Sequence, residues 1–131
     1  MLIHLSLMAI IFLLPVAAGA EPESPVCSQN RDGIVKDYYP DGKIKTEWMC
    51  RDGHLNGETK LYYGNGKLEK NSMYVNDVRQ GVTYGYYESG ELKSVCNYKA
   101  GKLDGPHKIL DEDGLIKEFT VYKNGVDVGI E

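Results

Sequence analysis

The chain has 131 residues, of which 42% are hydrophobic and 26% are charged, and its formal net charge is −4. This mild acidity argues against a nucleic-acid partner, because phosphate backbones require clustered Lys and Arg. It also argues against binding to an anionic membrane surface, and the length corresponds to one domain.

The first twenty residues have the pattern of a secretory signal peptide. An apolar run extends from Leu5 to Leu14, and the segment closes on Ala18-Gly19-Ala20, which predicts cleavage after Ala20. A membrane anchor is the alternative, but the run is shorter than the roughly 20 residues that a spanning helix needs. We therefore predict signal peptide 1–20, a periplasmic or secreted mature protein, and no membrane span after cleavage.

Residues 21–31 contain Pro22 and Pro25, which favour an extended leader or an N-terminal cap. From residue 32 to residue 131 the sequence is periodic, and glycines recur every 24 residues in three series. This periodicity predicts four tandem repeats, at 33–56, 57–80, 81–104 and 105–128. The series are Gly33, Gly57, Gly81, Gly105 and Gly129; Gly42, Gly66, Gly90 and Gly114; and Gly53, Gly101 and Gly125, with Asp77 substituted for one glycine of the third series.

Each unit contains two strand-like stretches separated by a polar residue and a glycine. Residues 58–63 and 67–74 are the two stretches of the second unit, and Asn65-Gly66 lies between them. A hairpin turn of this kind requires positive φ, which glycine adopts at little cost. We therefore predict that Gly42, Gly66, Gly90 and Gly114 occupy structural turns.

The second stretch of each unit alternates with a period of two. Alternation would place Leu68, Ser72 and Tyr74 on one side and their neighbours on the other, so neither face is wholly apolar. A single hairpin is marginally stable in water, and stability must come from stacking neighbouring units. The expected fold is all-β: a single-layer, elongated antiparallel sheet of about eight strands made of stacked β-hairpin repeats.

Residues 57–68 read G-x-x-x-x-Y-Y-x-x-G-K-L, and Tyr74-Val-Asn-Asp follows. This pattern resembles the MORN-variant repeat family, and the resemblance extends from Asp32 to Gly129. Such repeats are assigned to YwqK-type antitoxin proteins and also occur in exported bacterial proteins of unknown role. The resemblance implies a stacked-hairpin fold and carries no catalytic motif.

Few residues in the predicted mature chain suggest chemistry. Cys50 and His54 form a sequence-adjacent thiol–imidazole pair, but no motif supplies a third orienting group. Asp111, Glu112 and Asp113 cluster at a turn without the ligand spacing of a calcium loop. We predict no catalytic residue, no metal site and no cofactor, and therefore a protein that is not an enzyme.

The tyrosines offer the candidate binding face. Aligned aromatic columns suit protein contacts, although a one-layer sheet needs the same rings for stability. A column of Lys45, Glu69, Lys93 and Lys117 is expected to flank the opposite face. We predict a protein-binding module, antitoxin- or immunity-like; the alternative is a structural or envelope-surface component that binds glycan or lipid. The candidate binding residues are Tyr62, Tyr63, Tyr74, Tyr86, Tyr87 and Tyr98.

The three cysteines leave an odd thiol in an oxidising compartment. Cys50 and Cys96 are nearly two repeats apart, about 19 Å in a regular array, which excludes a bond between them. Cys27 lies in the leader and could reach Cys50, although a regular continuation of the sheet would point it to the other face. Sequence leaves open whether Cys27 and Cys50 pair, with Cys96 as the free or intermolecular thiol, whether Cys27 pairs with Cys96, or whether all three are unpaired.

Overall fold

The computed structural model describes residues 26–28 and 32–130, so the predicted signal peptide lies outside the described residues. The described chain is all-β, and no helix in it is long and apolar enough to cross a membrane. Its strands are β1 (Gly33–Tyr38), β2 (Ile44–Arg51), β3 (His54–Tyr62), β4 (Leu68–Val75), β5 (Val78–Arg79), β6 (Gly81–Tyr86), β7 (Leu92–Lys99), β8 (Lys102–Leu103), β9 (Gly105–Leu110), β10 (Ile116–Lys123) and β11 (Val126–Asp127).

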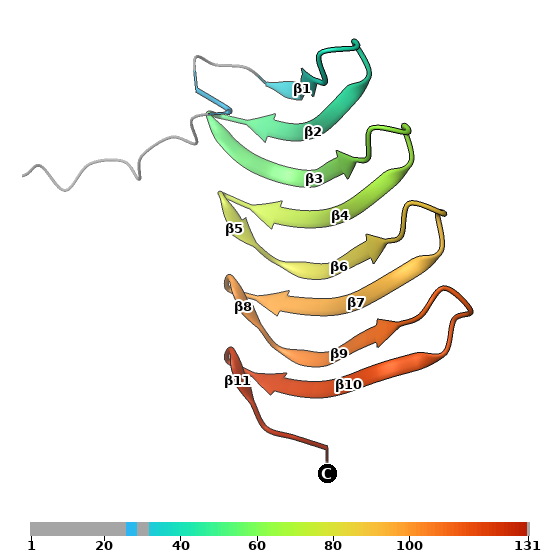
Figure 1. The fold of residues 1–131 in the computed structure, drawn as a ribbon. Helices are drawn as coiled ribbons and strands as arrows, with labels where there is room; N and C mark the ends of the chain where they lie inside the picture. The colour runs from blue at the N-terminus through green and yellow to red at the C-terminus, as the bar shows by residue number, and fades with distance from the viewer. Residues whose placement is uncertain (1–25, 29–31, 131) are drawn as a thin grey trace, which may run out of the picture.

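These strands form one open antiparallel sheet in which hairpins stack in chain order (Figure 1). The hairpins are β1–β2, β3–β4, β6–β7 and β9–β10, and each contacts the next through a neighbouring strand. This arrangement confirms the predicted single-layer stack of hairpins.

The sheet has eleven strands where about eight were expected. Eight of them have six to nine residues and match the expected hairpins, while β5, β8 and β11 have two residues each. The additional strands are short pairings that form as the chain turns from one hairpin to the next. Sequence periodicity does not reveal them, because a two-residue bridge depends on the path of the loop.

The hairpin turns are built alike in all four repeats. Gly42, Gly66, Gly90 and Gly114 have φ of 87°, 85°, 98° and 82°. Their N–H groups donate to the carbonyls of Tyr39, Tyr63, Tyr87 and Asp111, three residues earlier. A Cβ at such a φ is strained, which explains why glycine recurs there.

A β-bulge next to each turn interrupts the alternation of the strands. In the second repeat Tyr62 pairs with Leu68 while Leu61 pairs with Lys70, so Glu69 is the extra residue. The other hairpins have the same shift, which makes Lys45, Lys93 and Lys117 the extra residues there. One extra residue reverses the alternation. The prediction that Leu68 shares a side with Ser72 and Tyr74 is therefore wrong.

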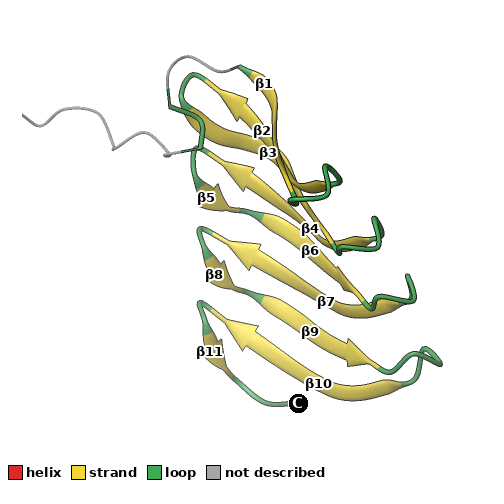
Figure 2. Ribbon diagram, turned by 45° about the horizontal axis from the view of Figure 1, so that its top comes forward, coloured by secondary structure: helices red, strands yellow, loops and turns green. Residues whose placement is uncertain are grey.

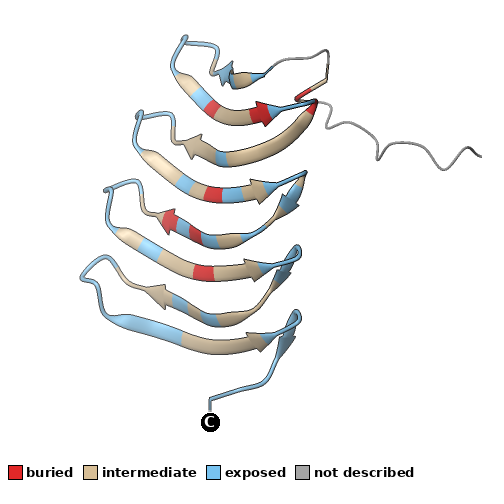
Figure 3. Ribbon diagram, turned by 180° about the vertical axis from the view of Figure 1, so that it is seen from behind, coloured by how far each residue is buried: buried red, intermediate tan, exposed pale blue. Residues whose placement is uncertain are grey.

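The sheet is bent along its strands into an open trough (Figure 2). Buried residues lie mostly in the middle of strands (Figure 3). They include Thr46, Ser72, Thr83 and Cys96, which the register places on one face, called the inner face. Register places Ser72 opposite Thr59, and Thr83 opposite Cys96, on this same face. Small side chains occupy the centre of the bend, because in a single-layer sheet only the inside of a curve excludes water. The other side is called the outer face.

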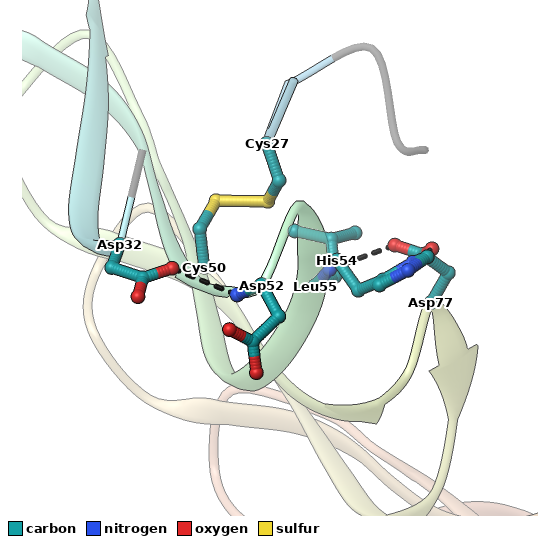
Figure 4. The surroundings of a disulfide bond; sticks show 7 residues. All are labelled: Cys27, Asp32, Cys50, Asp52, His54, Leu55 and Asp77. Atoms are coloured by element: carbon teal, nitrogen blue, oxygen red, sulfur yellow. Dashed lines mark hydrogen bonds and ion pairs between the residues drawn. A yellow bond between two sulfur atoms is a disulfide. The ribbon is translucent and has the colours of Figure 1, made fainter. Parts of the chain in front are cut away.

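A disulfide joins the leader to the first hairpin. Cys27 and Cys50 are bonded, their Cα atoms are 5.5 Å apart, and both side chains are buried. Figure 4 shows Cys27 lying over Cys50 at the end of β2. Residues 26–28 form a turn and no strand of the sheet, so the mismatch of phase weighed in the sequence does not prevent this pairing. Cys96 is a free, buried cysteine.

Candidate functional site

The second tyrosine of each pair connects one repeat to the next. The hydroxyls of Tyr39, Tyr63 and Tyr87 donate to the carbonyls of Tyr62, Tyr86 and Leu110 at 2.6, 2.6 and 2.7 Å. Each bond spans 23 residues, so it crosses from one hairpin to the following one. Burial raises the pKa of the Tyr63 phenol, which keeps this donor protonated. These tyrosines have a structural task.

The bulge residues lie beside these rings. The Lys45 ammonium is 5.9 Å from the ring centre of Tyr39, and Lys93 is 5.4 Å from that of Tyr87. The prediction that the column of Lys45, Glu69, Lys93 and Lys117 flanks the face opposite the tyrosines is therefore wrong at these two positions. The bulge turns each of these lysines towards the tyrosine of its own turn.

A second aromatic column on the inner face holds an arginine. The Arg79 guanidinium lies 4.6 Å from the ring centre of Tyr98 and 5.6 Å from that of Tyr74. Its Nε and one terminal nitrogen donate to the Tyr74 hydroxyl at 3.3 and 3.1 Å. Register fixes this arrangement, because Tyr74 and Arg79 are opposite residues of β4 and β5. The cation is thus held between two rings.

A polar hollow of about 240 Å³ lies on the inner face around Lys70, four residues along β4 from Tyr74. Lys70 and Ser94 are the residues opposite Gly85 on its two neighbouring strands, and all three line the hollow. Tyr63, Glu69 and Lys93 line it from the side of the turns, together with Tyr86, whose backbone carbonyl accepts the Tyr63 hydroxyl. The arrangement places two ammonium groups, a hydroxyl and one carboxylate around a small open space.

Cations on this part of the inner face lack carboxylate partners. Four ion pairs join residues within the described chain, and none of them includes Lys70, Arg79 or Lys93. The thiol of Cys96 lies within reach of two of these charges. Burial raises the pKa of Cys96, while a hydrogen bond with Tyr98 and the charges of Arg79 and Lys70 act in the opposite direction. The net rise keeps Cys96 a neutral thiol.

The first tyrosine of each pair belongs to the outer face. The Tyr62 hydroxyl donates to the Glu47 carboxylate at 3.0 Å, and Lys36 pairs with the same carboxylate at 3.1 Å. The bond with Lys36 lowers the pKa of Glu47. Tyr86 follows Tyr84 at a spacing of two residues and takes the same outer position. The six candidate tyrosines therefore do not share one face: Tyr63, Tyr74, Tyr87 and Tyr98 are inner, and Tyr62 and Tyr86 are outer.

The outer face becomes apolar towards the third and fourth hairpins. A hollow of about 290 Å³ there is lined by Val82, Val95 and Pro106, among others. Val82 and Tyr84 are each 38% exposed. This surface is broader and less polar than the inner hollow, and it has no charged group that would select a ligand other than the ammonium of Lys108.

The pair of Cys50 and His54 singled out in the sequence has no shared chemistry in the structure. Cys50 is bonded to Cys27, and His54 contacts Asp77 through its Nδ1 at 2.5 Å (Figure 4). Asp77 also accepts the Leu55 N–H at 2.7 Å. At the acidic turn, Asp111 accepts the N–H groups of Asp113 and Leu115, which gives its carboxylate a structural role. The described residues contain no cluster of three or more potential metal ligands.

The sequence matches the model of the MORN repeat variant over residues 31–49, 55–76 and 79–100. The chain belongs to this repeat family. The three matched segments coincide with the hairpins β1–β2, β3–β4 and β6–β7. No curated protein matches the chain.

The fourth hairpin of this MORN-variant protein continues the sheet beyond the matched segments. It carries Pro106 after its opening glycine, and Leu110-Asp111 in place of a tyrosine pair. Leu110 still accepts the bond from Tyr87 through its backbone carbonyl. The carbonyl does not depend on residue type, which explains why the stack tolerates the lost tyrosine.

Sequence reasoning missed the cations of the inner face. Lys70, Arg79 and Gly85 differ from every residue aligned with them. Thr46, Ser94 and Glu118 align with Lys70; Leu55, Leu103 and Asp127 with Arg79; and Asp37, Leu61 and Ile109 with Gly85. A search for exceptions to the repeat would have found all three. Their convergence on one face required the register of the sheet.

Proposed function

We propose that this MORN-variant protein is an exported, non-enzymatic module that binds another protein along the inner face of its sheet. Membership of the repeat family supports a binding role. The signal-like segment at residues 1–20 supports export, and an antitoxin- or immunity-like role is the finer form of the proposal. The partner is met outside the cytoplasm.

The observation that carries the proposal is the Tyr74–Arg79–Tyr98 cluster. Tyr and Arg are the residue types that dominate protein–protein hot spots, because they combine apolar area with hydrogen bonding. Arg79 is only partly buried, and its charge has no acidic partner among the described side chains. A partner that supplied a carboxylate and packed on the two rings would satisfy both features.

Photo-crosslinking tests the proposal. A photoreactive amino acid is placed at Tyr74 or Tyr98, and in matched controls at the adjacent outer-face positions Met73 or Asn97. The mature protein is then irradiated in the native extracellular or periplasmic fraction. We expect one protein adduct, identified by mass spectrometry, from the inner positions and not from the outer ones. Adducts formed only with glycan or lipid, or equal protein adducts from both faces, would contradict the proposal.

A further inference from the structure

Three residues that differ from those aligned with them lie at the junction of the second and third hairpins. Lys70 and Gly85 are opposite residues on β4 and β6, and Arg79 lies on β5 beside the same strand β4. The residues aligned with them in the other repeats are neutral or acidic, and none is cationic. The exceptions therefore change the inner face at one place, giving it space and positive charge.

Gly85 provides the space. A Cβ built at this position would lie 2.5 Å from the Ser94 hydroxyl oxygen, so even the smallest side chain would intrude on the hollow. Leu61 and Ile109 occupy the corresponding inner positions of the flanking repeats. The glycine leaves the Ser94 hydroxyl and the stem of Lys70 facing the open volume of about 240 Å³.

Lys70, Arg79 and Lys93 provide the charge. One carboxylate, Glu69, lines the hollow, and it faces Tyr63, whose pKa it helps to raise. Two of these cations, Lys70 and Lys93, line the hollow against the single carboxylate, and Arg79 adds a third positive charge farther along β4, on a protein whose overall charge is −4. Lys70 and Arg79 both act on the Cys96 thiol, two residues along β7 from Ser94, which places the hollow and the arginine cluster on one continuous surface.

We infer that this junction, defined by Lys70, Arg79, Gly85, Lys93 and Ser94, binds carboxylate side chains of an extended acidic segment of a partner polypeptide. The inference rests on the proposed protein-binding function and names the chemistry of the segment bound. One carboxylate enters the hollow and accepts hydrogen bonds from Lys70, Lys93 and the Ser94 hydroxyl. A second meets Arg79, whose planar guanidinium can bind a carboxylate through two parallel bonds.

Charge and shape favour a polypeptide over a free anion. Side chains four residues apart on an extended chain point the same way and lie roughly 13 Å apart. Lys70 is likewise four residues along β4 from Tyr74, the residue opposite Arg79, so two such carboxylates match the two cationic positions. The rings of Tyr74 and Tyr98 then contact the aliphatic parts of the segment between its carboxylates. A small anion would use one cationic position and leave the rings without a ligand.

The experiment measures binding of fluorescent peptides to the full mature chain by anisotropy. The probe is a synthetic peptide in which glutamates alternate with threonines, and its control has glutamine at every glutamate. Inorganic phosphate and phosphatidylserine-containing vesicles are tested as the competing sources of negative charge. We expect saturable, salt-sensitive binding of the glutamate peptide, and neither binding of the glutamine peptide nor displacement by equimolar phosphate.

Protein variants take residues that the repeat already accepts elsewhere, so folding is preserved. Arg79→Leu copies Leu55, and Lys70→Thr copies Thr46. Each variant is expected to bind the glutamate peptide about tenfold more weakly, as loss of a charge-assisted bond implies. Lys99→Ser, which removes one charge from the exposed outer side of β7, is the matched control and should leave binding unchanged.

Three results would overturn the inference: equal binding of both peptides, equal loss with Lys99→Ser, or binding of vesicles in place of the peptide. Failure of the acidic-segment inference can be distinguished from failure of the proposed function. If the crosslinks from Tyr74 and Tyr98 persist in Arg79→Leu and Lys70→Thr, the inner face binds a protein without this acidic recognition. If the crosslinks are absent from the unaltered chain, the proposed function itself is wrong.

Discussion

Adjacent tyrosines of this chain have different tasks because they point to opposite faces. Tyr63 holds the next hairpin through a carbonyl, while Tyr62 lies on the outer face against Glu47. Tyr74 and Tyr98 have another environment again, on either side of a guanidinium. The composition of ten tyrosines therefore does not describe one binding surface. At the residue scale, the identity of the hydrogen-bond partner separates structural tyrosines from those free to meet a ligand.

The turn glycines offer a direct test at this scale. Gly66 has φ +85°, and a Cβ there would meet no atom within 4 Å, so substitution costs backbone strain without a clash. We expect Gly66→Val to destabilise the mature protein by about 1–3 kcal/mol in urea unfolding. Gly64 is the matched control, because it lies in the same turn with neither positive φ nor a close neighbour. Equal stability of the two variants would contradict the turn assignment.

At the scale of the elements, the bulge separates what the sequence predicts from what it does not. Spacing of Gly42, Gly66 and Gly90 is sufficient to predict the hairpins and their turns. The extra residue beside each turn leaves no mark in the spacing, because every repeat contains it at the same place. A strict alternation through Glu69 therefore predicts the wrong face for Leu68. It also predicts, wrongly, that the lysine column points away from the tyrosines.

The inter-repeat tyrosine bond can be tested at the same scale. Tyr63→Phe keeps the ring and removes the hydroxyl that donates to the Tyr86 carbonyl at 2.6 Å. We expect a loss of about 0.5–1.5 kcal/mol of unfolding free energy. Tyr38→Phe is the control, since Tyr38 is 54% exposed. An equal loss in both variants would show that the hydroxyl of Tyr63 does not hold the hairpins together.

Asp77, in the loop between β4 and β5, makes the contact of this loop with the start of β3 sensitive to acid. Burial opposes ionisation, but the bonds from His54 and the Leu55 N–H outweigh it and lower the pKa of Asp77 below its usual 3.8. The carboxylate therefore stabilises the fold fully above that usual value, and the contribution disappears as pH falls through the lowered pKa. The melting temperature of Asp77→Asn should lie below that of the unaltered protein at neutral pH. The gap should narrow on acidification, and a gap independent of pH would contradict this role.

At the scale of the molecule, regularity determines the fold and irregularity determines the candidate site. Columns of glycine and tyrosine repeat without insertion, so the stack of hairpins follows from the period alone. The hollow and its cations exist because Lys70, Arg79 and Gly85 depart from their columns. Their separation in sequence hides the site, and only the pairing of β4 with β5 and β6 brings them together.

The disulfide should stabilise one end of the array more than the other. Cys27 and Cys50 are separated by 23 residues, and closing a loop of that size stabilises a fold by about 3 kcal/mol in the chain-entropy account. Repeats contact only their neighbours, so the benefit should decay along the stack. We expect reduction, or Cys27→Ser with Cys50→Ser, to accelerate hydrogen exchange in β1 and β2 far more than in β9 and β10. Cys96→Ser is the control with the disulfide intact. Uniform acceleration along the sheet would refute this account, because the disulfide would then not stabilise the first hairpin selectively. A Cys27–Cys96 link in peptide mapping of the non-reduced protein would also refute it, because Cys27 would then not be bonded to the first hairpin.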